Sequence, residues 1–172
     1  MALKTLQDLF VNELKDVYSA EKQILQALPK MAKAASSPDL RRAFETHRKQ
    51  TQDQVTRLDK IFEQLGASAR GKKCKGMEGL LAEGTDIMED EGEEAVIDAG
   101  LIAAAQRVEH YEIAAYGCLR TYATLLGQPK AATLLEETLQ EEESADQLLS
   151  KLADGGVNQA ALSAAPERGE EE

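Results

Sequence analysis

Glutamate and histidine gather in a helix-forming stretch of the chain, where residues 107–117 read RVEHYEIAAYG. Glu109 and Glu112 are three residues apart, so on an α-helix they share one face. The surrounding sequence is rich in alanine, leucine and isoleucine and predicts a helix that faces a protein core. A buried carboxylate is costly unless it is neutralised, paired or bound to a metal. These glutamates are therefore either solvent-exposed or part of a site.

Polar residues also interrupt the apolar pattern of the other long helices that the sequence predicts. Positions spaced by threes and fours face a core, and on the four helices they include a polar residue each: Glu21, His47 (followed by Gln54), Glu112 and Glu142. Three acidic residues on three helices can hardly pair with one another, and they need cations. Counting about 1.5 Å per residue from the predicted turns places Glu21, Glu112 and Glu142 near the middle of the helices, together with Gln50 and Asp53 of the second helix.

The helices themselves are predicted from this periodicity and from turn residues. Four long helices are expected, at about 3–35, 38–65, 93–126 and 129–154. Short turns near 36–39 and 126–129 join them in two pairs, and a connection over 66–92, with a short helix at 77–89, crosses between the pairs. We expect Pro29 to kink or break the first helix. The pattern predicts an all-α, ferritin-like four-helix bundle.

One domain accounts for the predicted helices. Residues 1–156 are expected to form the bundle, because Gly155 and Gly156 end the last helix. Residues 157–172 are expected to be a loosely ordered, acidic tail that ends in GEEE.

The net charge disfavours some classes of partner, and the cysteines indicate the redox state of the compartment. The formal net charge of −11 disfavours nucleic acid and anionic membranes as partners. Two cysteines, Cys74 and Cys118, without a CxxC motif or a signal-peptide pattern, are typical of a reduced cytoplasmic protein. No apolar run approaches the roughly 20 residues that a membrane span needs.

The polar residues that face the core have the types and spacing of a metal site. Carboxylates and imidazole from four helices at one level are what a two-metal carboxylate centre needs, and they suit iron and manganese. Besides the residues above, Gln50 and Asp146 share a helix face with His47 and Glu142. Three of the candidates have a simpler interpretation: Glu109 and Asp146 as solvated residues, and His47 as a core histidine with satisfied hydrogen bonds.

Two residues close to Glu109 and Glu112 in the sequence are not proposed as metal ligands. His110 is expected to face away from the core. Tyr116 lies one turn beyond Glu112, and we interpret it as a packing residue whose hydroxyl is hydrogen-bonded.

Several segments together resemble the YciF/YciE type of bacterial ferritin-like stress protein over nearly the whole chain. These segments are DVYSAEKQILQALPKMA (16–32), AFETH (43–47), CKGMEGL (74–80), DAGLIAAAQRVEHYEIAAYGCL (98–119) and LLEETLQEEESAD (134–146). The EHYE and SAEKQ stretches are also similar to ligand segments of rubrerythrin-like di-iron proteins. The resemblance implies that Glu21, Glu109, Glu112 and Glu142 are metal ligands, with His47 and Asp146 as helpers.

The chain departs from the pattern of that resemblance at two positions. Gln50 stands where the YciF type commonly has glutamate, and the fourth helix has Ala145 and Asp146 where di-iron bundles usually carry a histidine. Both departures bear on whether two metal positions are filled.

Three functions are compatible with these observations. The first is a stress-response protein with up to two iron or manganese ions per chain, which acts on peroxide or dioxygen. The second is a non-enzymatic structural or partner-binding bundle with weak or no metal binding. Iron storage is disfavoured, because no ordered helix is expected after Gly156. A homodimer is expected, paired through an apolar flank that includes Leu6 and Leu9.

Overall fold

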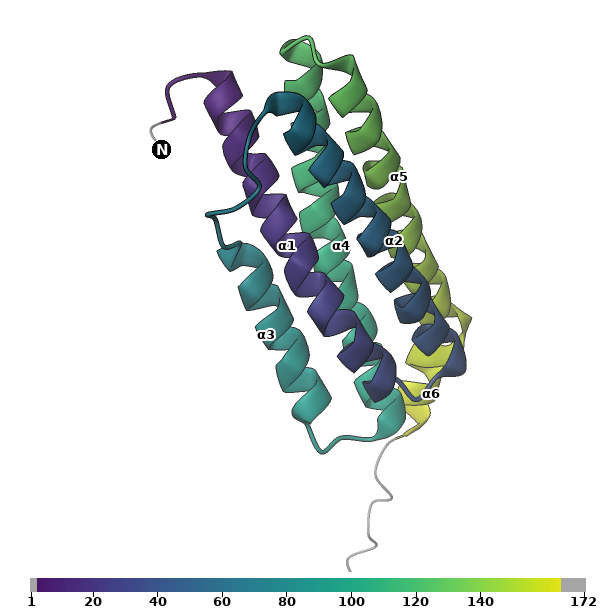
Figure 1. Ribbon diagram of the computed structural model, residues 1–172. Coiled ribbons are helices and arrows are strands. Elements are labelled where there is room, and N and C mark those ends of the chain that lie inside the picture. The colour runs from purple at the N-terminus through teal and green to yellow at the C-terminus, as the bar shows by residue number, and fades with distance from the viewer. Residues whose placement is uncertain (1–2, 165–172) are drawn as a thin grey trace, which may run out of the picture.

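The computed structural model describes residues 3–164, and this part of the chain folds into helices joined by loops. The elements are α1 (Leu6–Ala34), α2 (Pro38–Leu65), α3 (Lys75–Glu89), α4 (Glu94–Leu125), α5 (Pro129–Leu152), a π-helical turn (Ala153–Val157) and α6 (Asn158–Ser163). Helices α1, α2, α4 and α5 run side by side as a bundle, and α3 lies along its outside (Figure 1). The predicted four-helix bundle with a short helix in its long crossover is confirmed.

Local signals in the sequence explain where the first two helices begin and end. Thr5 and Asp8 form a capping box, so α1 begins at Leu6 rather than at Leu3. The Ser37 hydroxyl accepts a hydrogen bond from the amide of Leu40 and caps α2. Gly66 ends α2 with a φ of 60°, a left-handed conformation that glycine adopts without strain.

Pro29 does not break α1, which continues from Leu6 to Ala34. The proline is exposed, so the backbone carbonyl that loses its helical partner can be hydrated instead. The expected interruption of this helix is therefore absent.

Two apolar clusters fill the bundle, one on each side of a polar level. One includes Ile24, Leu28, Phe44, Leu101 and Leu149, and the other includes Phe10, Leu14, Leu58, Leu119 and Leu135. On α2, α4 and α5 the residues between the two clusters are His47, Glu109, Glu112 and Glu142. The polar level is thus held from both sides by close-packed side chains, which fix its height along the helices.

Close contacts attach the crossover helix α3 to the bundle. Gly100 on α4 leaves room for Ile87, since a Cβ there would lie 2.9 Å from the Ile87 side chain. The amide of Cys74 donates to the Ser19 hydroxyl at 2.9 Å, and the Cys74 carbonyl accepts from the Gln23 side chain at 3.0 Å. These hydrogen bonds join the start of α3 to α1.

The segment after Gly156 differs from the sequence-based expectation. Residues 158–163 form α6, which packs against α4, so this part of the predicted tail is helical. Gly156, with a φ of 141°, turns the chain between α5 and α6 without ending helical structure. Residues 165–172, including the predicted acidic GEEE end, lie outside the described residues.

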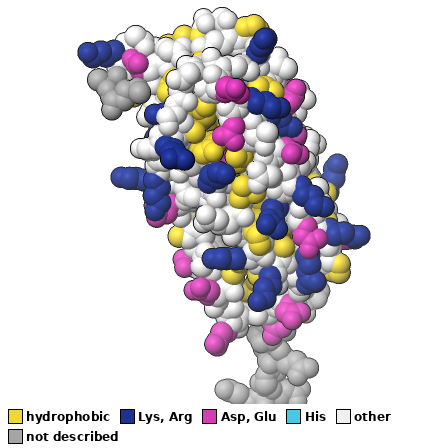
Figure 2. All heavy atoms as spheres, viewed as in Figure 1, with side chains coloured by type: hydrophobic (Ala, Val, Ile, Leu, Met, Phe, Trp, Pro, Cys, Tyr) yellow, Lys and Arg dark blue, Asp and Glu magenta, His cyan; other side chains and the backbone are white. Residues whose placement is uncertain are grey.

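The outer surface combines charges of both signs. On the face shown in Figure 2, basic and acidic side chains are interspersed, with apolar atoms between them. Within residues 3–164, none of the helices has both the length and the apolar character that a membrane crossing requires.

Asp98 joins the turn between α1 and α2 to the start of α4. Its carboxylate, 3% exposed, accepts hydrogen bonds from the Ser36 amide at 2.8 Å, the Ser36 hydroxyl at 2.6 Å and the Ser37 amide at 2.8 Å. Two backbone donors that no helix satisfies therefore depend on one side chain.

We expect Asp98→Ala to lower the free energy of unfolding by about 2–4 kcal/mol, because buried backbone donors lose their acceptor. Urea unfolding followed by circular dichroism measures this. Asp98→Asn should cost less, since it keeps one acceptor, and the exposed Asp86→Ala should change little. Equal effects of Asp98→Ala and Asp86→Ala would contradict the proposed role of Asp98.

Candidate metal centre

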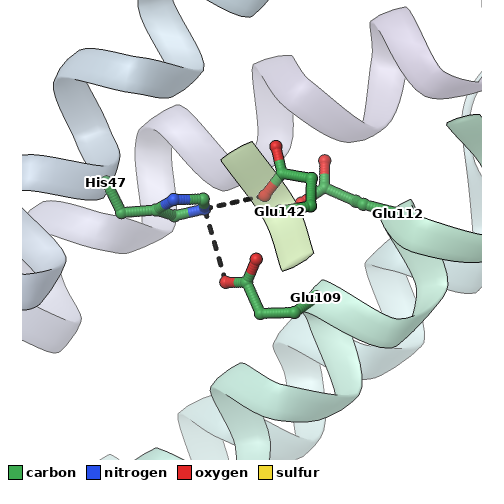
Figure 3. A group of neighbouring side chains, drawn as sticks. All are labelled: His47, Glu109, Glu112 and Glu142. Atoms are coloured by element: carbon green, nitrogen blue, oxygen red, sulfur yellow. Dashed lines mark ion pairs between the residues drawn. The ribbon is translucent and has the colours of Figure 1, made fainter. Parts of the chain in front are cut away.

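Four side chains from three helices meet at the polar level of the bundle. His47 comes from α2, Glu109 and Glu112 from α4, and Glu142 from α5 (Figure 3). All four are buried, and one potential ligand atom of each lies within 4.8 Å of the others. The spacing of three residues between the α4 glutamates turns both toward the same point.

The distances from His47 to the glutamates of this group are longer than those of good hydrogen bonds and close to those between ligands of one metal ion. Nε2 of His47 lies 3.4 Å from Oε1 of Glu109 and 3.7 Å from Oε2 of Glu142. Both distances exceed the range of a good N–H···O bond. Ligand atoms that each lie about 2.1 Å from one metal ion are roughly 3–3.5 Å apart.

Helix α1 contributes Glu21, which is fully buried beside Glu112. The hydroxyl of Tyr116, also fully buried, donates a hydrogen bond to Oε1 of Glu21, while Oε2 has no partner. Burial raises the pKa of Tyr116, so the hydroxyl keeps its proton and remains a donor. Tyr116 thus fixes the direction of the Glu21 carboxyl group, and the hydrogen bond that the sequence led us to expect for its hydroxyl is made to this residue.

Gln54 is the residue of the site that the ligand prediction omitted. Its side-chain Nε2 donates to Oε1 of Glu142 and, at 3.1 Å, to Glu141, which in turn binds the Arg57 guanidinium at 2.6 and 2.7 Å. The core-facing spacing after His47 already includes Gln54, and this was the signal that could have identified it.

Asp146, which the sequence proposed as a ligand, does not belong to the group of four, and Gln50, the other proposed ligand, lies beside the group. Gln50 is half-buried and lines a cavity beside His47. The Asp146 carboxylate accepts from Gln106 at 3.1 Å and lies 3.3 Å from Nε2 of His110, which is exposed. The buried cluster therefore consists of His47, Glu109, Glu112 and Glu142, with Glu21 beside them.

Burial and mutual repulsion hold protons on these carboxyl groups when no cation is present. The pKa of Glu109 is raised to about 7, mainly by burial; contact with Glu142 lowers it, and the charges of Glu21 and Asp146 contribute to the rise. Burial also raises the pKa values of Glu21, Glu112 and Glu142 well above their usual range, and neighbouring carboxylates add to each effect.

The unpaired atoms of the site fit a cationic group. Among the described residues, nine buried side-chain N or O atoms have no hydrogen-bond partner, and eight of them belong to Glu21, His47, Gln54, Glu109, Glu112 and Glu142. Both oxygens of Glu112 are among them. Buried polar atoms are normally satisfied, and hard carboxylate oxygens with one imidazole suit iron or manganese.

Protein freed of metal with a chelator should become more stable as the pH falls from 8 to 5. The folded-state pKa of Glu109 is above its unfolded value near 4.5, so the folded chain binds more protons in this window and the stabilisation is lost as the pH rises through about 7. We expect a gain on the order of 2 kcal/mol. Urea unfolding at several pH values measures it.

A matched pair of variants assigns that pH dependence to the site. Glu109→Gln should reduce the slope of stability against pH, whereas Glu143→Gln, exposed on α5, should retain it. Stability that is flat between pH 5 and 8 would show that the buried carboxyl groups do not titrate as their surroundings require.

Comparisons with known proteins support this architecture. Residues 5–162 match the family described as "Domain of unknown function (DUF892)". The chain is 47% identical over 162 residues to protein YciF of Escherichia coli K12. The aligned region covers 94% of this chain and 98% of that protein. The crystal structure of that E. coli stress protein, at 47% identity, superposes with a TM-score of 0.88 over 91% of this chain and 99% of the other.

Two further solved structures share the fold. YcfI from Rhodopseudomonas palustris, described as a candidate structural protein, is 39% identical, with a TM-score of 0.83 over 86% of this chain and 94% of the other. A protein from Xanthomonas campestris pv. campestris, 24% identical with a TM-score of 0.74 over 92% and 96% of the two chains, shows the fold alone. From the family match and the near full-length identity to YciF, the chain belongs to the DUF892 family, the family of the stress protein YciF.

Proposed function

We propose that this protein binds iron or manganese, up to two ions per chain, at the buried cluster and reacts there with peroxide or dioxygen. One observation carries the proposal: eight unpartnered buried polar atoms converge from the four helices of the bundle. When bound, such ions supply electrons and Lewis acidity to an O–O bond. The identity to a stress protein supports a role of this kind.

The residues around the cluster have separate tasks in this proposal. Glu109, Glu112, Glu142 and His47 supply ligand atoms, and Glu21 adds a carboxylate from α1. Hydrogen bonds from Tyr116 and Gln54 each hold one carboxylate oxygen and leave the other free to bind. Ligands whose orientation is fixed in this way lose less freedom when they bind a metal.

Added Mn²⁺ or Fe²⁺ should raise the melting temperature of chelator-treated protein. Binding to the folded state alone stabilises it by about 2.7 kcal/mol when free metal is 100 times the dissociation constant. Glu112→Ala should lose most of this gain, although the metal-free variant should melt no lower than the parent, because a buried acid has been removed. Differential scanning calorimetry and elemental analysis measure both effects.

The control for the metal experiment is Glu143→Ala, which changes an exposed carboxylate on α5. It should keep the full metal-dependent rise in melting temperature. If Glu143→Ala and Glu112→Ala lose the same amount, the metal binds at the surface and the proposed centre is wrong.

Metal-loaded protein should consume hydrogen peroxide. Without an added reductant, turnover beyond the electrons that the bound metal can supply is dismutation, in which one peroxide is oxidised to dioxygen and another reduced to water. We expect Glu112→Ala to lower the rate at least tenfold. An oxygen electrode measures the dioxygen released, and the absorbance of peroxide measures the peroxide consumed. Peroxide loss without dioxygen release would indicate reduction at the expense of the metal, and no loss at all would exclude peroxide as substrate.

A structural role is the second candidate, and the description of YcfI favours it. In that case the buried carboxyl groups would stay protonated or hydrogen-bonded to one another. Metal would then leave the melting temperature unchanged, whereas the acid-side stabilisation of the metal-free protein would remain. The calorimetric experiment therefore separates the two candidates.

We also propose that the chain forms a homodimer through the start of α1. Leu6 and Leu9 are half-buried there and border a shallow depression with the exposed Leu3. An apolar strip of this kind is common at interfaces between identical chains. Light scattering measures the mass of the particle in solution, and the mass of a single chain would exclude the dimer.

A further inference from the structure

A cavity of about 150 Å³ lies directly beside the carboxylate cluster. Side chains from α1, α2, α3, α4 and α5 line it, and its wall is mainly apolar, with Ile24, Leu28, Met31, Phe44, Val108 and Leu149 among its residues. His47 and Glu109 also belong to the wall, and they are the members of the cluster that reach it. The cavity is thus an apolar space with buried ligand residues on one side.

The cavity also reaches the surface, because some of the residues that line it are exposed. These are Thr46 on α2 and Ser144 and Leu148 on α5, with Leu148 43% exposed. Gln50 and Ala145, which also line the cavity, are half-buried. The lining thus extends from exposed residues of α2 and α5 to the buried His47 and Glu109.

We propose that this cavity binds a small apolar organic molecule of about the size of benzene, carrying at most one polar group, which faces His47 and Glu109. An apolar cavity of about this volume in another protein stays dry and accepts benzene. His47 and Glu109 are the polar, buried residues of the wall, and Nδ1 of His47 and Oε2 of Glu109 have no hydrogen-bond partner, so they are available to a polar group. A sugar or a nucleotide is excluded, because most of its hydroxyl or phosphate groups would lose their hydrogen bonds against the apolar wall.

The proposal that the cavity binds such a molecule does not depend on the proposed function. A role of the cavity as the entrance to a metal centre does rest on the proposed function. As the entrance to a metal centre, the apolar wall would select molecules that are easily desolvated, such as organic compounds with a short hydrocarbon chain. Ala105 and Ala145 keep the space open, because a larger side chain at either position would fill it.

The test uses benzene and metal-free full-length protein, followed by two-dimensional NMR of backbone amides and methyl groups. We expect saturable shifts confined to the lining residues, including Leu28, Val108 and Leu149. Ala145→Phe should weaken binding at least tenfold, whereas Gln147→Phe, two residues away and exposed on the same helix, should bind like the parent. Shifts that do not saturate, that spread over the surface or that survive Ala145→Phe would overturn the proposal.

A second variant keeps the test decisive if Ala145→Phe fails to fold. Met31→Ala enlarges the cavity, so it should bind p-xylene at least tenfold more tightly than the parent does. Unchanged affinity for p-xylene would again overturn the proposal.

Metal uptake, measured separately by elemental analysis, distinguishes failure of the cavity from failure of the metal centre. Benzene binding without metal uptake would support the cavity and reject the centre, whereas metal uptake without benzene binding would reject the cavity alone.

Discussion

The burial of four glutamates with a single imidazole at one level of the bundle is the constraint on which the rest of the structure depends. In water these groups would repel one another weakly, but between four helices they are desolvated as well. Such a set persists only if protons or cations compensate the charge. Its cost is offset by the two apolar clusters above and below, which are packed too closely to let the helices rotate and expose the glutamates.

The remaining elements keep those helices in register. Asp98 holds the turn that sets α1 and α2 relative to α4, and the anchored start of α3 covers the outer side of α1. Because the polar residues occupy the middle of long helices, a small shift of one helix would separate ligand atoms that now lie within a few ångströms. Rigid ends therefore matter to the centre even though they lie far from it.

The sequence predicted the bundle well because helical periodicity is a repeated signal, present in every turn of each long helix. It also predicted that Glu112 and Glu142 lie at one level, because their depth follows from counting residues, and it included Glu109 and His47 because of their spacing along the helices. It could not choose between Gln50 and Gln54, which lie one turn apart, because that choice depends on helix rotation and on which amide finds Glu142. The helix after Gly156 was missed because glycine signals a helix end by its local freedom, whereas packing against α4 decided the outcome.

The hydrogen-bonded series from Arg57 through Glu141 and Gln54 to Glu142 connects the surface to the interior. The Arg57 and Glu141 side chains are 17% and 26% exposed, so solvent still reaches this ion pair, whereas Glu142 is fully buried. The outer ion pair is therefore linked to the buried carboxylate through the amide of Gln54, which donates to both glutamates. Loss of the Arg57 guanidinium would leave Glu141 free to draw that amide outward, so a contact at the surface helps to decide how firmly an interior oxygen is held.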